Sequence, residues 1–152
     1  MIATFDKLPH METSLVRKRL RDSIEDAQKN AIARRAANQE AIAAWEQVLE
    51  QVVTPLFQQV SQVLKSEGYA FRVITPAGTI RLTSERSADD YIEAGLDTSG
   101  PVPVVVARVK RTRGREQFND EHIVASGDAI PGLSDERLLD LLTGMLGPFL
   151  ER

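Results

Sequence analysis

The chain has 152 residues, 42% of them hydrophobic and 27% charged, so we expect one domain with one hydrophobic core rather than global disorder. It contains no cysteine, which excludes a disulfide framework, a thiolate metal site and a cysteine nucleophile. The net charge of −3 gives the whole molecule no electrostatic attraction to nucleic acid. No stretch is apolar enough for a secretory signal or a membrane span, so we expect a cytoplasmic protein without a membrane partner.

A long helical segment is predicted over residues 13–67, after a loose segment at residues 1–12. No glycine or proline occurs from Met11 to Thr54, and Ala, Glu, Gln, Arg and Leu dominate, which is typical of uninterrupted helix. Apolar residues at steps of three or four form one narrow face in its first half: Val16, Leu20, Ile24, Ala27 and Ala31.

A wider apolar face follows in the second half of this segment. Arg34, Arg35 and Asn38 lie between the two faces where a heptad needs apolar residues, so a strict coiled coil is not expected. A continuous helix of about 40 residues would be about 60 Å long and would exceed the width of the domain, so part of it needs external cover. The simplest cover is a second copy. We therefore predict a homodimer with an interface that contains Ile42, Trp45, Leu49, Val52 and Leu56.

Pro55 interrupts this helical segment. It has no N–H, and its ring clashes with the carbonyl four residues earlier, at a cost of about 3 kcal/mol. We predict either a kink at Pro55 or a second helix that begins there with Thr54 as its N-cap. Gly68 is expected to end the helix.

An antiparallel meander of four or five strands is predicted over residues 69–126, with helices on one face. Strands are expected at residues 70–75, 79–83, 91–96, 102–111 and 122–125. Glycine in Pro76-Ala77-Gly78 and in Arg113-Gly114-Arg115 allows two tight reversals. The fourth strand is apolar on both faces near its middle, which favours a central place in the sheet.

The C-terminal residues 133–152 have the period of an amphipathic helix with Ser134 as N-cap. Gly144 and Gly147 are expected to mark close packing or an early end. The predicted fold class is therefore α+β, with residues 1–152 in a single domain.

The sequence predicts no catalytic residue, cofactor or metal site. Phosphate-loop, dinucleotide-binding, hydrolase and zinc-protease motifs are missing, and neither His10 nor His122 has a second ligand at a suitable spacing. The first hypothesis is therefore a non-enzymatic protein that binds a second copy of itself and another protein.

Two further hypotheses depend on charged residues. A nucleic-acid-associated regulator would use the basic cluster Arg108, Lys110, Arg111, Arg113 and Arg115, together with the basic residues at 17–21. Solvated charges that keep a hairpin soluble explain the same cluster. A small-ligand binder or enzyme would use a pocket between the sheet and the helices, lined by Asp89, Asp90 and Glu93.

Overall fold

The computed structural model describes residues 11–151 of the chain, which divides into two compact units, Met1–Ala36 and Ala37–Arg152. The loose segment predicted at residues 1–12, which includes His10, lies outside the described residues except for Met11 and Glu12. The second unit contains the sheet, the C-terminal helix and the only cluster of buried side chains among the described residues. The predicted α+β class is confirmed.

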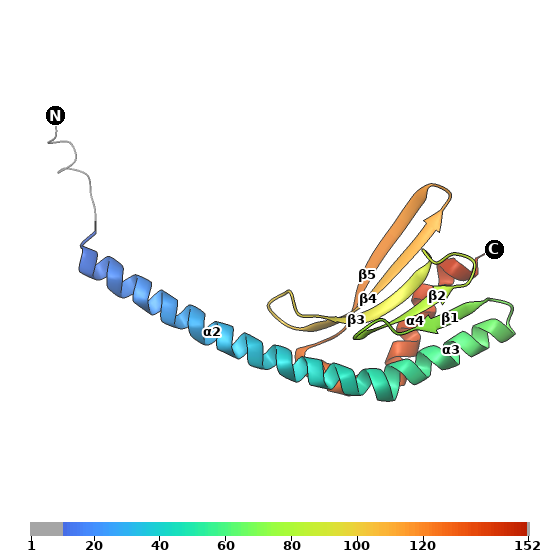
Figure 1. Cartoon of the computed structure of the whole chain (residues 1–152), viewed down its shortest axis with the longest axis horizontal. Helices are drawn as coiled ribbons and strands as arrows, with labels where there is room; N and C mark the ends of the chain where they lie inside the picture. The colour runs from blue at the N-terminus through green and yellow to red at the C-terminus, as the bar shows by residue number, and fades with distance from the viewer. Residues whose placement is uncertain (1–10, 152) are drawn as a thin grey trace. The chain divides into compact units, whose positions relative to one another are not determined.

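The predicted long helical segment is confirmed, with a local irregularity before Pro55. Helix α2 covers Thr13–Val48, and helix α3 covers Thr54–Ser66. A π-helical turn, η1, connects them at Leu49–Val53. Because Pro55 cannot donate the N–H that a regular helix needs, the wider turn accommodates it without ending the helical path. Figure 1 shows the ribbon changing direction between α2 and α3, which agrees with the predicted kink.

The predicted meander has five strands, and each strand pairs antiparallel with the next (Figure 1). The strands are β1 Phe71–Ile74, β2 Thr79–Ser84, β3 Tyr91–Asp97, β4 Val104–Arg113 and β5 Glu116–Ser126. The sheet order is the sequence order, so β3 is the middle strand. The fourth strand is an interior strand but not the central one, because β5 is the only strand beyond it.

The fifth strand is much longer than the predicted range of 122–125. Its first residues are exposed on both faces, and they pair with the equally polar end of β4 down to Arg113 and Glu116. Gly114, with φ 63°, makes the tight reversal between the two strands. The alternation of apolar and polar residues is lost here because this end of the hairpin contributes no residue to the core, so periodicity could not reveal the strand.

One face of the sheet carries the core. Alternate strand residues, such as Ile80, Ile92 and Val105, are fully buried and cluster with Phe57 of α3 and Leu142 of the C-terminal helix. This confirms that helices cover one face of the sheet. The opposite face carries polar and charged side chains, which is the usual arrangement of an antiparallel sheet with one wet face.

The C-terminal helix α4 covers Asp135–Leu150, and the predicted cap is confirmed because the Ser134 hydroxyl accepts a hydrogen bond from the Arg137 N–H at 3.2 Å. The prediction that Gly144 and Gly147 mark close packing or an early end of this helix was wrong. A Cβ at Gly144 or Gly147 would meet no atom within 4 Å, and the helix continues through Pro148. Close packing occurs instead at Gly95 in β3, where a Cβ would lie 2.8 Å from Cγ2 of Thr79.

Candidate functional site

A row of alternating charges crosses four strands on the wet face of the sheet. The register places Arg81, Glu93, Arg108 and Glu121 opposite one another on β2, β3, β4 and β5. Arg81 forms an ion pair with Glu93 at 2.6 Å, and Arg108 Nε donates to Glu121 at 2.9 Å. Side chains of opposite charge that face each other on neighbouring strands attract each other and stabilise the sheet. This row is therefore a self-neutralised part of the sheet and not a positive surface.

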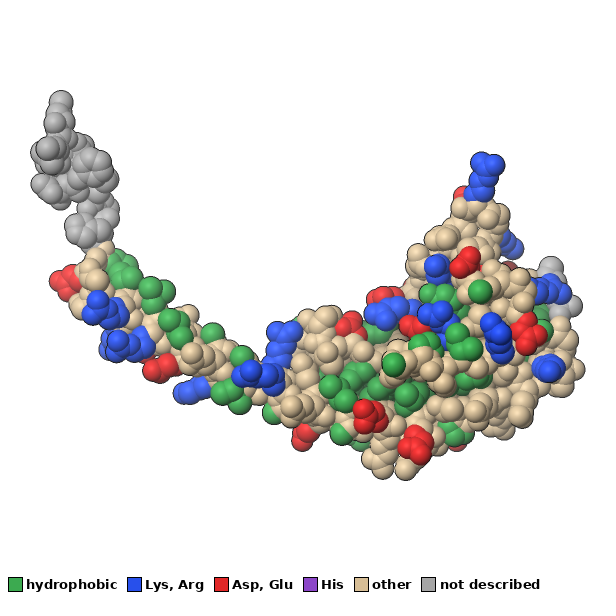
Figure 2. Space-filling view, in the orientation of Figure 1, with side chains coloured by type: hydrophobic (Ala, Val, Ile, Leu, Met, Phe, Trp, Pro, Cys, Tyr) green, Lys and Arg blue, Asp and Glu red, His purple; other side chains and the backbone are tan. Residues whose placement is uncertain are grey.

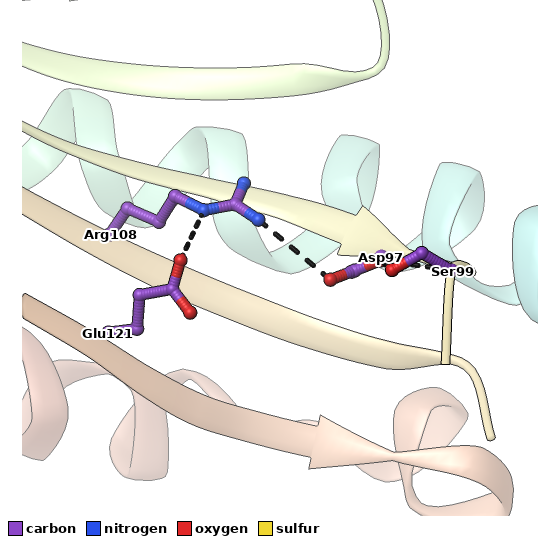
Figure 3. Close-up of polar contacts among 4 residues, drawn as sticks. All are labelled: Asp97, Ser99, Arg108 and Glu121. Atoms are coloured by element: carbon purple, nitrogen blue, oxygen red, sulfur yellow. Dashed lines mark hydrogen bonds and ion pairs between the residues drawn. The ribbon is translucent and has the colours of Figure 1, made fainter. Parts of the chain in front are cut away.

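Asp97 extends the row at the end of β3 (Figure 3). Hydrogen bonds from the Ser99 hydroxyl at 2.6 Å and the Ser99 N–H at 2.9 Å lower the pKa of Asp97, and the Arg108 charge adds to this effect. Arg108 lies 3.9 Å from Asp97. Its hydrogen bond to Glu121 is the main cause of the raised pKa of Arg108. Arg108 therefore stays charged, and its charge is shared between two carboxylates.

The structure divides the predicted basic cluster between two faces of the sheet. Arg108 and Lys110 share the wet face with Glu93 and Tyr91, which lie opposite them on β3. Arg111 points away from that face, because its guanidinium donates to the Pro148 carbonyl of α4 at 3.2 Å and lies 5.2 Å from the Phe118 ring. The cluster predicted from the sequence is therefore not one continuous basic surface.

Arg111 and Arg113 instead border a cavity of about 450 Å³ at the end of the sheet beside the last turn of α4. We call it the arginine cavity. A third arginine, Arg86, joins them from the loop after β2. Arg86 was not predicted as a site residue, because residues so far apart in the chain meet only through the pairing of the strands.

The acidic residues of the small-ligand hypothesis separate in the same way. Asp90 lines the arginine cavity, and its Oδ1 accepts hydrogen bonds from the Thr112 N–H at 2.8 Å and the Thr112 hydroxyl at 2.9 Å. Glu93 lies on the wet face and pairs with Arg81. Asp89 is exposed and does not border this cavity. One of the three predicted residues therefore belongs to a cavity between the sheet and a helix.

The residues predicted for the dimer interface lie along the part of the helical path that belongs to the second unit. Trp45 is only 2% exposed, and its indole N–H donates to the Gly78 carbonyl at 2.8 Å. Leu56 is also buried, while Leu49 and Val52 are partly buried against the same core. Ile42 remains exposed. The chain itself thus covers most of these five residues. An interface between chains at these positions stays a prediction.

The narrower apolar face at the start of α2 remains exposed to solvent. Leu20 and Ile24 are 58% and 56% exposed, and every residue from 11 to 37 is exposed, including Val16 at 37%. Arg17 and Arg21 border the same surface as these side chains. In Figure 2 hydrophobic side chains follow one edge of this helix, and charged side chains of both signs, most of them basic, follow the other. We call the surface of Val16, Leu20, Ile24, Ala27 and Ala31 the apolar stripe.

A shallow groove in the second unit has the opposite charge. It is lined by small apolar residues of α2, of the loop before β4 and of a short 3-10 helix, η2, at Gly127–Gly132. Its only charged lining residues are Glu40 and Asp128. Its volume is about 530 Å³, and Val102 on its wall is 50% exposed. We call it the alanine groove, after Ala37, Ala41 and Ala44 on its helical wall.

The chain matches no protein-family model, no curated protein and no solved structure. Among the described residues, no three His, Asp or Glu side chains gather as a metal site would require. In the same part of the chain, no helix has both the length and the apolar composition that crossing a membrane requires. Any function must therefore be argued from the surfaces described above.

Proposed function

We propose that this protein is a non-enzymatic interaction protein that assembles with copies of itself through the start of α2. The observation that carries the proposal is the exposed apolar stripe. Covering one leucine or isoleucine side chain stabilises a complex by about 1.5–3 kcal/mol relative to leaving it in water. An amphipathic helix in a protein also gains most of its stability from packing of its apolar face. Because the chain leaves this stripe exposed, we infer that another molecule covers it.

Charge indicates which surface of the second copy covers the stripe. Residues 13–36 contain seven Lys or Arg and three Asp or Glu, a net charge of +4, whereas residues 37–152 contain 11 and 17, a net charge of −6. Two stripes packed against each other would place Arg17 and Arg21 close to like charges, which costs energy. The larger unit of a second copy offers attraction instead.

The alanine groove is the surface of that unit that fits best. Its small side chains allow a helix backbone to approach closely, and the narrow stripe itself contains Ala27 and Ala31. Glu40 and Asp128 on the groove can face Arg17 and Arg21 beside the stripe. We therefore propose that residues 13–31 of one copy occupy the alanine groove of another.

The nucleic-acid alternative has less support. Its cluster at residues 108–115 is divided between two faces of the sheet, and Arg108 is engaged by Glu121 and Asp97, so only the exposed basic residues at 17–21 remain together for it. A phosphate backbone requires several cations along one continuous surface.

Light scattering coupled to size-exclusion chromatography tests the assembly. We expect the wild-type chain to be a dimer or larger at about 10 µM, and Leu20→Glu/Ile24→Glu to be a monomer with unchanged circular dichroism, because buried unpaired carboxylates oppose docking. Ala33→Glu/Ala36→Glu is the matched control. It adds the same charge to the opposite side of the helix and should leave the mass unchanged. A monomeric wild type, or equal effects of the two variants, would refute the proposal.

A further inference from the structure

The arginine cavity combines a cationic rim with an apolar wall. Arg86, Arg111 and Arg113 supply the rim. Phe149 and the small exposed part of Phe71, which is 6% exposed, supply the wall, and their rings meet edge to face at 6.0 Å. A guanidinium group recognises carboxylate and phosphate oxygens with two parallel N–H donors. The cavity thus offers separate places for an anionic group and for a hydrophobic body.

The arginines of the rim are available to a ligand. Arg86 and Arg113 form no ion pair with any residue between 11 and 151. Arg111 donates a hydrogen bond to the Pro148 carbonyl. Because this acceptor is neutral, the bond holds the guanidinium in place without neutralising its charge. Asp90 and Glu151 also line the cavity, so three cationic groups face two carboxylates. The Asp90 carboxylate is already hydrogen-bonded to Thr112 and competes less for the rim.

The size of the cavity limits the ligand. Pockets for single small molecules have volumes of about 300–1,000 Å³, and this cavity of about 450 Å³ is near the lower end of that range. A nucleic-acid backbone needs an extended basic track, and Arg115 at the nearby turn does not line the cavity. The geometry therefore favours a compact molecule over a polymer.

From these observations we propose that the arginine cavity is a binding site for a small organic anion, with one carboxylate or phosphate group held by Arg86, Arg111 and Arg113 and a hydrophobic body against Phe71 and Phe149. This site goes beyond self-assembly and shares no residue with the alanine groove.

Isothermal titration calorimetry with simple probes tests the site. Phenyl phosphate and benzoate carry the two kinds of anionic group, inorganic phosphate lacks the hydrophobic body, and benzyl alcohol lacks the charge. We expect saturable binding of phenyl phosphate or benzoate below about 10 mM, and at least about tenfold weaker binding of inorganic phosphate and benzyl alcohol. Whichever of the two anions binds more tightly identifies the anionic group.

Two variants locate the binding. Arg86→Ala/Arg113→Ala removes two exposed side chains that contribute nothing to the core and should weaken the better probe by at least about tenfold. Arg115→Ala removes a neighbouring arginine outside the cavity and should change the affinity by less than about twofold. Thermal unfolding checks that both variants fold.

Three results would overturn the proposal. They are no saturable binding of either anion, equal binding of benzyl alcohol, or equal losses in the two variants. Binding of a DNA duplex that displaces the probe and depends on Arg115 would support the nucleic-acid alternative instead. None of these results depends on whether the chain is an oligomer, so failure here and failure of self-assembly can be told apart.

Discussion

Trp45 shows how one side chain connects two parts of the fold. It is the only tryptophan, it is almost fully buried, and its indole N–H reaches the Gly78 carbonyl in the first hairpin. Large amphipathic rings combine hydrophobic burial with one directed hydrogen bond. Through this bond α2 is attached to the turn between β1 and β2, which neither helix propensity nor strand periodicity could have indicated.

Asp97 offers a prediction at the scale of single residues. Its carboxylate accepts hydrogen bonds from Ser99, and its pKa lies below the ordinary value of 3.8. A carboxyl group with a lowered pKa in the folded chain stabilises the fold above pH 3.8. That stabilisation is lost as the pH falls through the lowered pKa. We expect Ser99→Ala to be less stable than wild type at neutral pH, with the difference shrinking in acid.

Urea denaturation at several pH values measures this difference in the free energy of unfolding. Thr98→Ala is a suitable control, because no hydrogen bond connects the Thr98 side chain to Asp97 in the described structure. A difference between Ser99→Ala and wild type that stays constant down to about pH 2 would show that the Ser99 hydroxyl does not act through the ionised carboxylate.

At the scale of elements, β2 and β3 approach closely where Gly95 faces Thr79. A Cβ at position 95 would lie 2.8 Å from Thr79 Cγ2, which is too close for an unstrained contact. We expect Gly95→Ala to lower the free energy of unfolding by about 1–3 kcal/mol, because the added methyl group has to displace the Thr79 side chain. Chemical denaturation with circular dichroism measures this loss.

A second substitution makes the same prediction sharper. Thr79→Ser removes the methyl group that clashes and keeps the hydroxyl. This substitution alone should cost little, and the double variant Thr79→Ser/Gly95→Ala should recover most of the lost stability. Additive losses in the double variant would mean that the strain at Gly95 comes from elsewhere.

The whole molecule is electrically asymmetric, since residues 13–36 carry a net charge of +4 and residues 37–152 a net charge of −6. Residues 1–12 add a net charge of −1, and the total of −3 conceals this division. Such a chain can attract a second copy although its net charge predicts repulsion, because contact between unlike regions decides the interaction at short distance.

Salt dependence tests this electrostatic part of the proposed assembly. The Debye length falls from about 10 Å at 0.1 M salt to about 3 Å at 1 M, so exposed charge pairs weaken over this range. We expect the dissociation constant of the assembly, measured by analytical ultracentrifugation, to rise by at least about tenfold between these conditions. Tighter association at high salt would instead indicate a contact between apolar stripes.

Variants of the alanine groove complete this test. Glu40→Lys/Asp128→Lys reverses the charge of the groove and should raise the dissociation constant at low salt by at least about tenfold. Glu46→Lys is the control, because Glu46 is exposed on α2 but does not line the groove. Equal effects of both changes would indicate a general charge effect and not docking in the groove.

The sequence by itself determined the elements with regular periodicity. The long helical segment, the irregularity at Pro55, four of the five strands and the Ser134 cap were all predictable, because residue type and spacing act over a few neighbours. The polar half of β5 was not, because it contributes nothing to the core. Only the tertiary structure decided which charges meet. Strand pairing engages Arg108 with Glu121 and brings Arg86 to the cavity of Arg111 and Arg113, and such contacts depend on register between distant segments.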